Sequence, residues 1–125
     1  MLTIRREQMR AFENSRRTAF ARAIGESIEC TLRKMGRGNE CVELDATIHH
    51  GIEQAQRFGL TREREVARFV ETTILHLGIS GNKELPKPAL AILLSYGLDP
   101  SIKLERFHTW AQAESRKRSE AYAIL

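Results

Sequence analysis

The chain has 125 residues, of which 42% are hydrophobic and 29% are charged. This balance excludes an intrinsically disordered chain, and the length predicts a single domain over 1–125. The 20 basic and 16 acidic residues give a formal net charge of +4, but they are interspersed along the sequence. Because mixed charges dilute any local field, the composition favours an ordinary solvated helical surface over a surface that binds nucleic acid.

No apolar run approaches the ~18 residues that a membrane-spanning helix needs. The N-terminal segment becomes charged at Arg5 and Arg6, where a secretory signal peptide would carry its apolar stretch. We therefore predict a cytoplasmic protein without membrane contact. In that compartment Cys30 and Cys41 are expected to be free, half-buried thiols, because the cytosol keeps cysteines reduced.

Apolar and small residues recur at steps of three and four in the first part of the chain, which predicts one long helix over 5–35. The stripe consists of Met9, Phe12, Ala19, Phe20, Ala23, Ile24, Ile28, Leu32 and Met35. Gly25 lies inside this helix, but the stripe keeps its phase on both sides, so we expect the helix to continue. Gly36 and Gly38 are expected to end it.

Two further helices are predicted in the middle of the chain. The first covers 41–58 and ends at Gly59, which we expect to be a left-handed cap. Its apolar stripe consists of Cys41, Leu44, Ile48, Ile52, Ala55 and Phe58. Thr61 is expected to cap the next helix, with Glu63 and Glu65 in its first turn. The buried side of that helix is predicted to be Val66, Phe69, Val70, Ile74 and Leu77, followed by a closing Gly78.

The last part of the chain contains a loop and two helices. Glycine, asparagine and two prolines predict a loop over 79–88, and a short apolar helix is expected over 88–96. Asp99 before Pro100 predicts the start of the final helix. Its stripe consists of Ile102, Leu104, Phe107, Trp110 and Ala113, and beyond Glu114 the stripe fades.

The pattern as a whole predicts an all-α fold, a single-domain bundle of about five helices with a long N-terminal helix. We expect this first helix to pack across the others. The side chains expected to make that contact are Phe12, Phe20, Ile24, Ile28 and Leu32. No alternating run is long enough to predict a strand.

The sequence lacks the patterns that catalysis or metal binding requires. His49 and His50 are adjacent, so on a helix they point about 100° apart and cannot share an ion as an i, i+4 pair could. His76 and His108 stand alone on other predicted helices. Neither a Cys-x-x-Cys motif, a nucleophile elbow nor a phosphate-binding loop occurs. We predict no catalytic residue, no cofactor and no metal, and thus a protein that is not an enzyme.

Residues 55–66 match part of the helix-turn-helix pattern, because Ala55, Gly59 and Thr61 occupy the positions of its alanine, its turn glycine and its capping threonine. The likeness ends at Glu65, where a helix-turn-helix buries an aliphatic residue. The apolar residue falls one place later, at Val66, which rotates the second helix by about 100°. DNA recognition by this segment is therefore disfavoured.

Arginines of the first predicted helix are expected on the face opposite Phe12 and Phe20, where they could meet an acidic partner. They are Arg5, Arg6, Arg10, Arg16, Arg17 and Arg22. Some are expected to form intrahelical ion pairs with nearby glutamates. The candidate partner-binding residues of this face are Arg10, Arg16 and Arg17. The alternative surface combines the 79–88 loop with Tyr122, Ile124 and Leu125.

Several motifs occur in a characteristic order along nearly the whole chain. They are Met1–Met9, Gly51-Ile52, Phe58-Gly59-Leu60-Thr61, Glu65–Val70, Leu77-Gly78, Ala91-Ile92-Leu93 and Lys103-Leu104. This order resembles a family of small helical proteins encoded beside type VI secretion spike, adaptor and toxin genes in proteobacteria. Relatives usually have aromatic and acidic residues after the glycine matching Gly78, where this chain has Ile79-Ser80-Gly81-Asn82.

The resemblance implies an accessory chaperone or co-adaptor that helps to load or release an effector by contacting the larger adaptor. It implies no active-site residues. Two other functions stay open: an immunity protein that neutralises a cognate toxin, and a helical protein that binds nucleic acid. The partner itself, the oligomeric state and the binding face are not defined by the resemblance.

Overall fold

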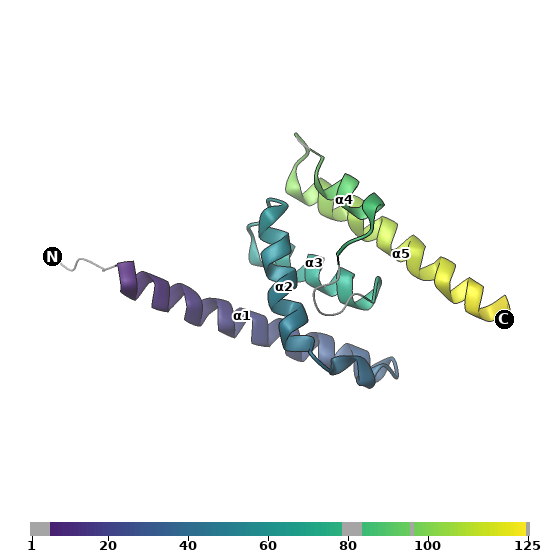
Figure 1. Ribbon diagram of the computed structural model, residues 1–125, viewed down its shortest axis with the longest axis horizontal. Coiled ribbons are helices and arrows are strands. Elements are labelled where there is room, and N and C mark those ends of the chain that lie inside the picture. The colour runs from purple at the N-terminus through teal and green to yellow at the C-terminus, as the bar shows by residue number, and fades with distance from the viewer. Residues whose placement is uncertain (1–5, 79–83, 96, 125) are drawn as a thin grey trace.

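The computed structural model describes the backbone over 6–78, 84–95 and 97–124 and the side chains over 15–78, 84–95 and 97–117. Within these ranges the chain is all-helical, with no strand, as predicted (Figure 1). The elements are α1 (Arg6–Lys34), the 3-10 helix η1 (Gly38–Cys41), α2 (Leu44–Arg57), α3 (Glu63–Leu75), α4 (Lys87–Leu93) and α5 (Pro100–Ile124). No helix in these ranges has both the length and the apolar character needed to cross a bilayer.

The helices form two groups that meet at α3. The main contacts of α1 are with η1, α2 and α3, whereas α5 packs against α3 and α4. The first helix therefore packs across α2 and α3, as predicted, but the prediction does not extend to α4 and α5, whose main contacts are with each other and, for α5, with α3. The N-terminal half of α1 and the C-terminal half of α5 extend beyond the other helices in opposite directions (Figure 1).

The buried face of α1 differs in part from the predicted stripe. Its buried residues are Ala21, Ile24, Ile28 and Leu32. The predicted stripe is wrong at Ala19, Ala23 and Met35, which are exposed. The two alanines lie outside the side of α1 that α2 and α3 cover, and Met35 follows the end of the helix. The side chains of Met9 and Phe12 lie outside the described ranges. Alanine occurs both at the surface and in the core, so an alanine in an apolar stripe does not show that its position is buried.

The helix α1 continues through Gly25, as predicted. A Cβ atom at this glycine would lie 3.3 Å from Cδ1 of Ile48, so the missing side chain permits close packing of α2. The next helix begins at Leu44 rather than at 41, because Glu43 adopts a left-handed φ of 63° that separates η1 from α2. Four residues of the predicted stripe are buried: Leu44, Ile48, Ile52 and Ala55. The other two, Cys41 and Phe58, lie outside α2 and are only half-buried.

The turn between α2 and α3 confirms one predicted cap and contradicts another. Gly59 has the expected positive φ, at 82°. Thr61 does not cap α3, because the helix begins one residue later than expected and its N-cap position is Arg62, whose side chain makes no capping hydrogen bond. The predicted core side chains of this segment are all buried: Val66, Phe69, Val70, Ile74 and Leu77.

The helix α5 begins as predicted. Oδ1 of Asp99 accepts hydrogen bonds from the backbone N–H of Ser101 at 2.9 Å and from its hydroxyl at 2.8 Å. Its buried residues are Leu104, Phe107 and Ala111. Ile102 is 43% exposed and Ala113 is also exposed, so the predicted stripe is wrong at these two positions. The reason is that α3 and α4 cover only one side of this helix.

The preceding helix, α4, is shorter than predicted. It begins one residue earlier, at Lys87, and ends at Leu93 instead of 96. Its buried residues are Ala89 and Leu93, whereas Leu94 just beyond it is 49% exposed. Within the predicted 79–88 loop, residues 79–83 lie outside the described ranges, and residues 84–86 are not helical.

Three aromatic rings join the two groups of helices. Phe69 of α3 is fully buried. Its ring centroid lies 5.9 Å from that of Phe58, which follows α2, and 5.3 Å from that of Phe107 of α5. Offset and edge-to-face contacts of this kind add to the burial of apolar area. Phe69 of α3 therefore contacts an aromatic ring from each of the two groups of helices.

Candidate functional site

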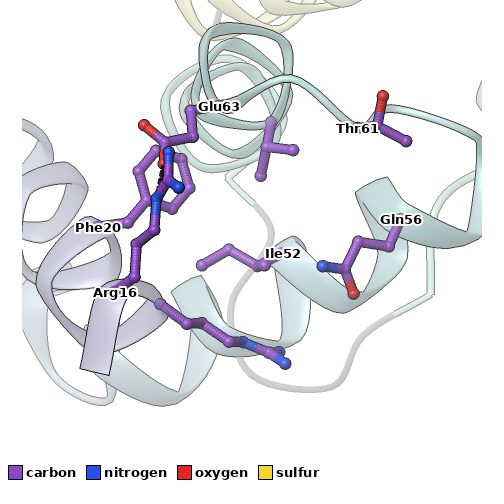
Figure 2. Close-up of a pocket in the computed structure, with 8 residues that line it drawn as sticks. Arg16, Phe20, Ile52, Gln56, Thr61 and Glu63 are labelled. Atoms are coloured by element: carbon purple, nitrogen blue, oxygen red, sulfur yellow. Dashed lines mark hydrogen bonds and ion pairs between the residues drawn. The ribbon is translucent and has the colours of Figure 1, made fainter. Parts of the chain in front are cut away.

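An open groove of about 460 Å³ lies where α1, α2 and α3 meet (Figure 2). We call it the α1–α3 groove. The lining residues are Arg16, Arg17, Phe20, Ile52, Gln56, Thr61, Glu63 and Val66. Its volume falls in the range of about 300–1,000 Å³ that is typical of binding sites.

The floor of the groove is apolar. Ile52 of α2 and Val66 of α3 are buried members of the core, and the half-buried ring of Phe20 packs against that core. Phe20 directly precedes the buried Ala21, so it lies at the edge of the α1 face that contacts the other helices. An apolar floor of this kind can bury an aliphatic or aromatic side chain of a ligand, which is the main source of affinity in such sites.

The rim of the groove is polar and carries two arginines. Nε of Arg16 lies 3.1 Å from Oε1 of Glu63 on α3, and Nη2 of Arg17 lies 3.5 Å from Oε1 of Glu53 on α2. In Figure 2 the side chain of Arg16 points toward Glu63, and the dashed line marks the contact between them. Both ion pairs are at the surface, so each contributes only on the order of 0.2–1 kcal/mol to stability.

The observed position of these arginines corrects the sequence prediction of the face on which they lie. Arg16 and Arg17 share the groove with Phe20 instead of lying on the opposite face. They precede Phe20 by four and three residues, and this spacing places side chains on the same face of a helix. The ion pairs of these two arginines join α1 to α2 and α3, a role that the sequence did not predict.

The other predicted partner-binding residues are not tested. The side chains of Arg10, Tyr122 and Ile124 lie outside the described ranges, as does Leu125. Their role in binding therefore stays a prediction.

The groove also contains residues that sequence reasoning did not assign to a site. Gln56 and Thr61 lie on its rim, and Glu63 was expected only to favour the helix dipole. Periodicity correctly predicted that Val66, and not Glu65, is the buried residue of this turn. No sequence pattern shows that α1 lies beside these positions, because that contact depends on tertiary packing.

A second polar cluster lies where α3 ends against α5, and it includes two histidines that were expected to be isolated. The ring centroids of His76 and His108 are 5.2 Å apart, with the rings nearly perpendicular. The hydroxyl of Thr72 donates to the carbonyl of Arg68 at 2.7 Å and lies 3.0 Å from Nδ1 of His108. Because the hydroxyl hydrogen is already used, Nδ1–H of His108 is the donor to Thr72, and Nε2 is the atom that gains a proton in acid.

Two arginines, Arg37 and Arg68, act on this histidine pair through their charges. Nη1 of Arg37 donates to the carbonyl of Leu75 at 2.9 Å, at the end of α3. Burial, with the charge of Arg37 as a smaller cause, lowers the pKa of His76 below its ordinary value of 6.5. Burial also lowers the pKa of His108, and the charges of Arg68 and His76 lower it further. Both rings therefore stay neutral to a lower pH than a free imidazole would.

This cluster predicts how the stability of the fold depends on pH. Because both folded-state pKa values are lowered, the unfolded chain binds protons more readily, and the free energy of unfolding falls as the pH drops from about 6.5 through the folded-state values. Thermal melts between pH 7.5 and 5 measure this fall. In the variant His76→Gln/His108→Asn, in which asparagine keeps a donor for Thr72, the melting temperature should decline less over the same interval. An equal decline in both proteins would refute a role of the pair.

The remaining histidines and the cysteines form no further cluster. His49 and His50 are half-buried on α2, and Nε2 of His50 has no hydrogen-bond partner among the described residues. Both cysteines are free thiols, with Cys30 exposed and Cys41 half-buried. In the described part of the chain, no three histidine, cysteine or carboxylate side chains are arranged to hold a metal ion.

Comparison with known proteins adds no relative. No protein-family model matches the chain, and neither a curated protein nor a solved structure matches it. The resemblance to proteins encoded beside type VI secretion genes therefore rests on the order of sequence motifs alone.

Proposed function

We propose that this chain is a non-catalytic protein-binding factor, and that the α1–α3 groove holds a partly apolar, acidic segment of its partner. One observation carries the proposal: two arginines stand on the rim of a groove whose floor is apolar and is formed by Ile52, Val66 and Phe20. An apolar residue of the partner would fill the floor, and neighbouring carboxylates would bind the guanidinium groups.

The chemistry of the rim favours an acidic segment. A guanidinium group can bind a carboxylate through two parallel hydrogen bonds, which gives orientation as well as attraction. The present partners of Arg16 and Arg17 are glutamates with side chains 55% and 56% exposed. Exchanging such a solvent-exposed carboxylate for one from the partner costs little, because exposed ion pairs are weak.

The order of sequence motifs supports a partner from a type VI secretion system. On this proposal the chain acts in the cytoplasm as a chaperone or co-adaptor, and its partner is the effector or the larger adaptor that carries it. The groove suits this role because it binds an exposed segment of another protein without needing a catalytic group.

Paired substitutions test the proposal. The chain is titrated against the purified adaptor and effector encoded beside its gene, and the dissociation constant is measured by calorimetry. Arg16→Gln/Arg17→Gln should weaken binding at least tenfold, about 1.4 kcal/mol. Glu53→Gln/Glu63→Gln should tighten binding, because it frees the same arginines for the partner. Arg33→Gln, which removes an exposed ion pair with Glu29 elsewhere on α1, should have no effect.

The two double variants form a matched control. Both remove the same two ion pairs, so their melting temperatures should fall by similar small amounts, whereas their affinities should change in opposite directions. If both variants weaken binding alike, the arginines act through the stability of α1 and not through contact with the partner. If neither protein binds the chain, the type VI assignment is wrong.

A further inference from the structure

A second cleft lies between the first half of α3 and the beginning of α5, and we call it the α3–α5 cleft. Its volume is about 480 Å³, and three arginines line it: Arg62, Arg64 and Arg68. Leu104 of α5, which is only 3% exposed, gives the cleft an apolar surface. Among the described residues, Thr61 alone lines both this cleft and the α1–α3 groove, so the two sites are distinct.

Both carboxylates of the cleft already have partners. Oε1 of Glu65 lies 3.9 Å from Nε of Arg62. The backbone N–H and the hydroxyl of Ser101 donate to Asp99. These bonds, with a smaller contribution from the charge of Arg62, lower the pKa of Asp99 below its ordinary value of 3.8. Neither carboxylate is paired with the other two arginines of the cleft.

Arg64 and Arg68 are the arginines that remain available. Within the part of the chain whose side chains the structure describes, neither forms an ion pair. They are four residues apart on α3, so their side chains are neighbours on one face of the helix. Besides burial, the charge of Arg68 lowers the pKa of His108 on α5, so this guanidinium lies on the side of α3 that faces α5. Two neighbouring positive groups therefore stand at the cleft without a counter-charge.

We propose that the α3–α5 cleft binds a phosphate monoester, with Arg64 and Arg68 holding the phosphate group and the organic part lying against Leu104. A phosphate monoester carries a charge of about −1.5 to −2 at pH 7 and three acceptor oxygens. Two adjacent guanidinium groups match this charge and geometry, whereas a single carboxylate would satisfy only one of them.

The size of the cleft and the state of the helix end agree with this ligand. A water molecule takes about 30 Å³, so a bare phosphate ion would fill only a minor part of the 480 Å³ and leaves room for an organic group. The first backbone N–H groups of α5 are already bonded to Asp99. The arginine side chains, and not the end of the helix, therefore supply the donors.

An NMR titration of the full chain tests the proposal. Phenyl phosphate is the probe, and benzoate, which carries the same ring on a carboxylate, is the comparison. We expect saturable shifts of the Nε–Hε signals of Arg64 and Arg68, with a dissociation constant on the order of 1 mM for phenyl phosphate and at least about tenfold higher for benzoate. No partner protein is present, so the result does not depend on the proposed function.

A phosphotyrosine peptide separates the two sources from which a monoester could come. Binding at least about tenfold tighter than that of phenyl phosphate would assign the monoester to a modified protein. Equal binding would assign it to a small molecule. Both results require the same contact with the two arginines.

Substitutions in the cleft should change the affinity for phenyl phosphate in opposite directions. Arg64→Gln/Arg68→Gln should weaken binding at least about tenfold. Both side chains are exposed, so this variant should keep its helical circular dichroism spectrum. Asp99→Asn should instead tighten binding, because it removes a negative charge from the cleft while asparagine remains a good helix cap.

Arg106→Gln is the matched control. Arg106 is also an exposed arginine without an ion pair in the described part of the chain, but it lines a different hollow on α5, so this variant should bind like the wild type. The proposal is overturned if phenyl phosphate does not bind up to about 20 mM, if benzoate binds equally well, or if Arg106→Gln weakens binding as much as the double variant.

Discussion

Replacing Phe69 by alanine should lower the free energy of unfolding by about 3–5 kcal/mol, the largest loss that we expect from a single substitution in this chain. The side chain is fully buried and its ring contacts the rings of Phe58 and Phe107. Truncation therefore leaves a cavity where α2 and α5 meet α3. Urea denaturation followed by circular dichroism measures the loss.

Phe58→Ala is the comparison for this prediction. The ring of Phe58 is half-buried and contacts Phe69 from the end of α2, so its removal should cost clearly less. Similar losses for the two variants would show that the core is not centred on Phe69.

Replacing Gly51 by valine should destabilise the fold by about 1–3 kcal/mol through overpacking. A Cβ atom at this position would lie 3.1 Å from Cγ2 and 3.6 Å from Cγ1 of Val70. Val70 is fully buried, so its side chain has little freedom to move away, and the extra methyl groups would push α2 away from α3. A double-mutant cycle with Val70→Ala measures this contact.

The double variant Gly51→Val/Val70→Ala should lose less stability than the sum of the two single variants, because alanine at 70 makes room for the new side chain. Strict additivity would contradict the close approach of α2 and α3. Gly25→Ala provides a milder case, since the Cβ atom would meet only the end of the Ile48 side chain.

The accuracy of sequence-based prediction differs between the central and the outer helices. Every residue of α3 that periodicity predicted to be buried is buried. The reason is that α3 contacts α1, α2 and α5, so its apolar side chains are covered by neighbouring helices. In α5 periodicity misassigned Ile102 and Ala113, which are exposed because no other helix covers their side. The spacing of apolar residues shows which side of a helix is apolar. It does not show whether another helix covers that side.

The groove was only partly predictable for a related reason. Arg16 and Arg17 were selected from their charge, yet their distance of four and three residues from Phe20 already places all three on one side of the helix. That Glu53 and Glu63 pair with them depends on how α1 lies across α2 and α3. The approach of His76 to His108 likewise depends on packing of α3 against α5, which no local pattern encodes.

Site-specific photo-crosslinking tests the central claim, binding through the α1–α3 groove, most directly. A photoreactive residue replaces Gln56, an exposed residue on the groove rim, or Gln112, an equally polar and exposed residue on α5. With the adaptor or effector present, position 56 should crosslink to an acidic segment of that protein, and position 112 should not. Crosslinking from position 112 with none from position 56 would contradict the account.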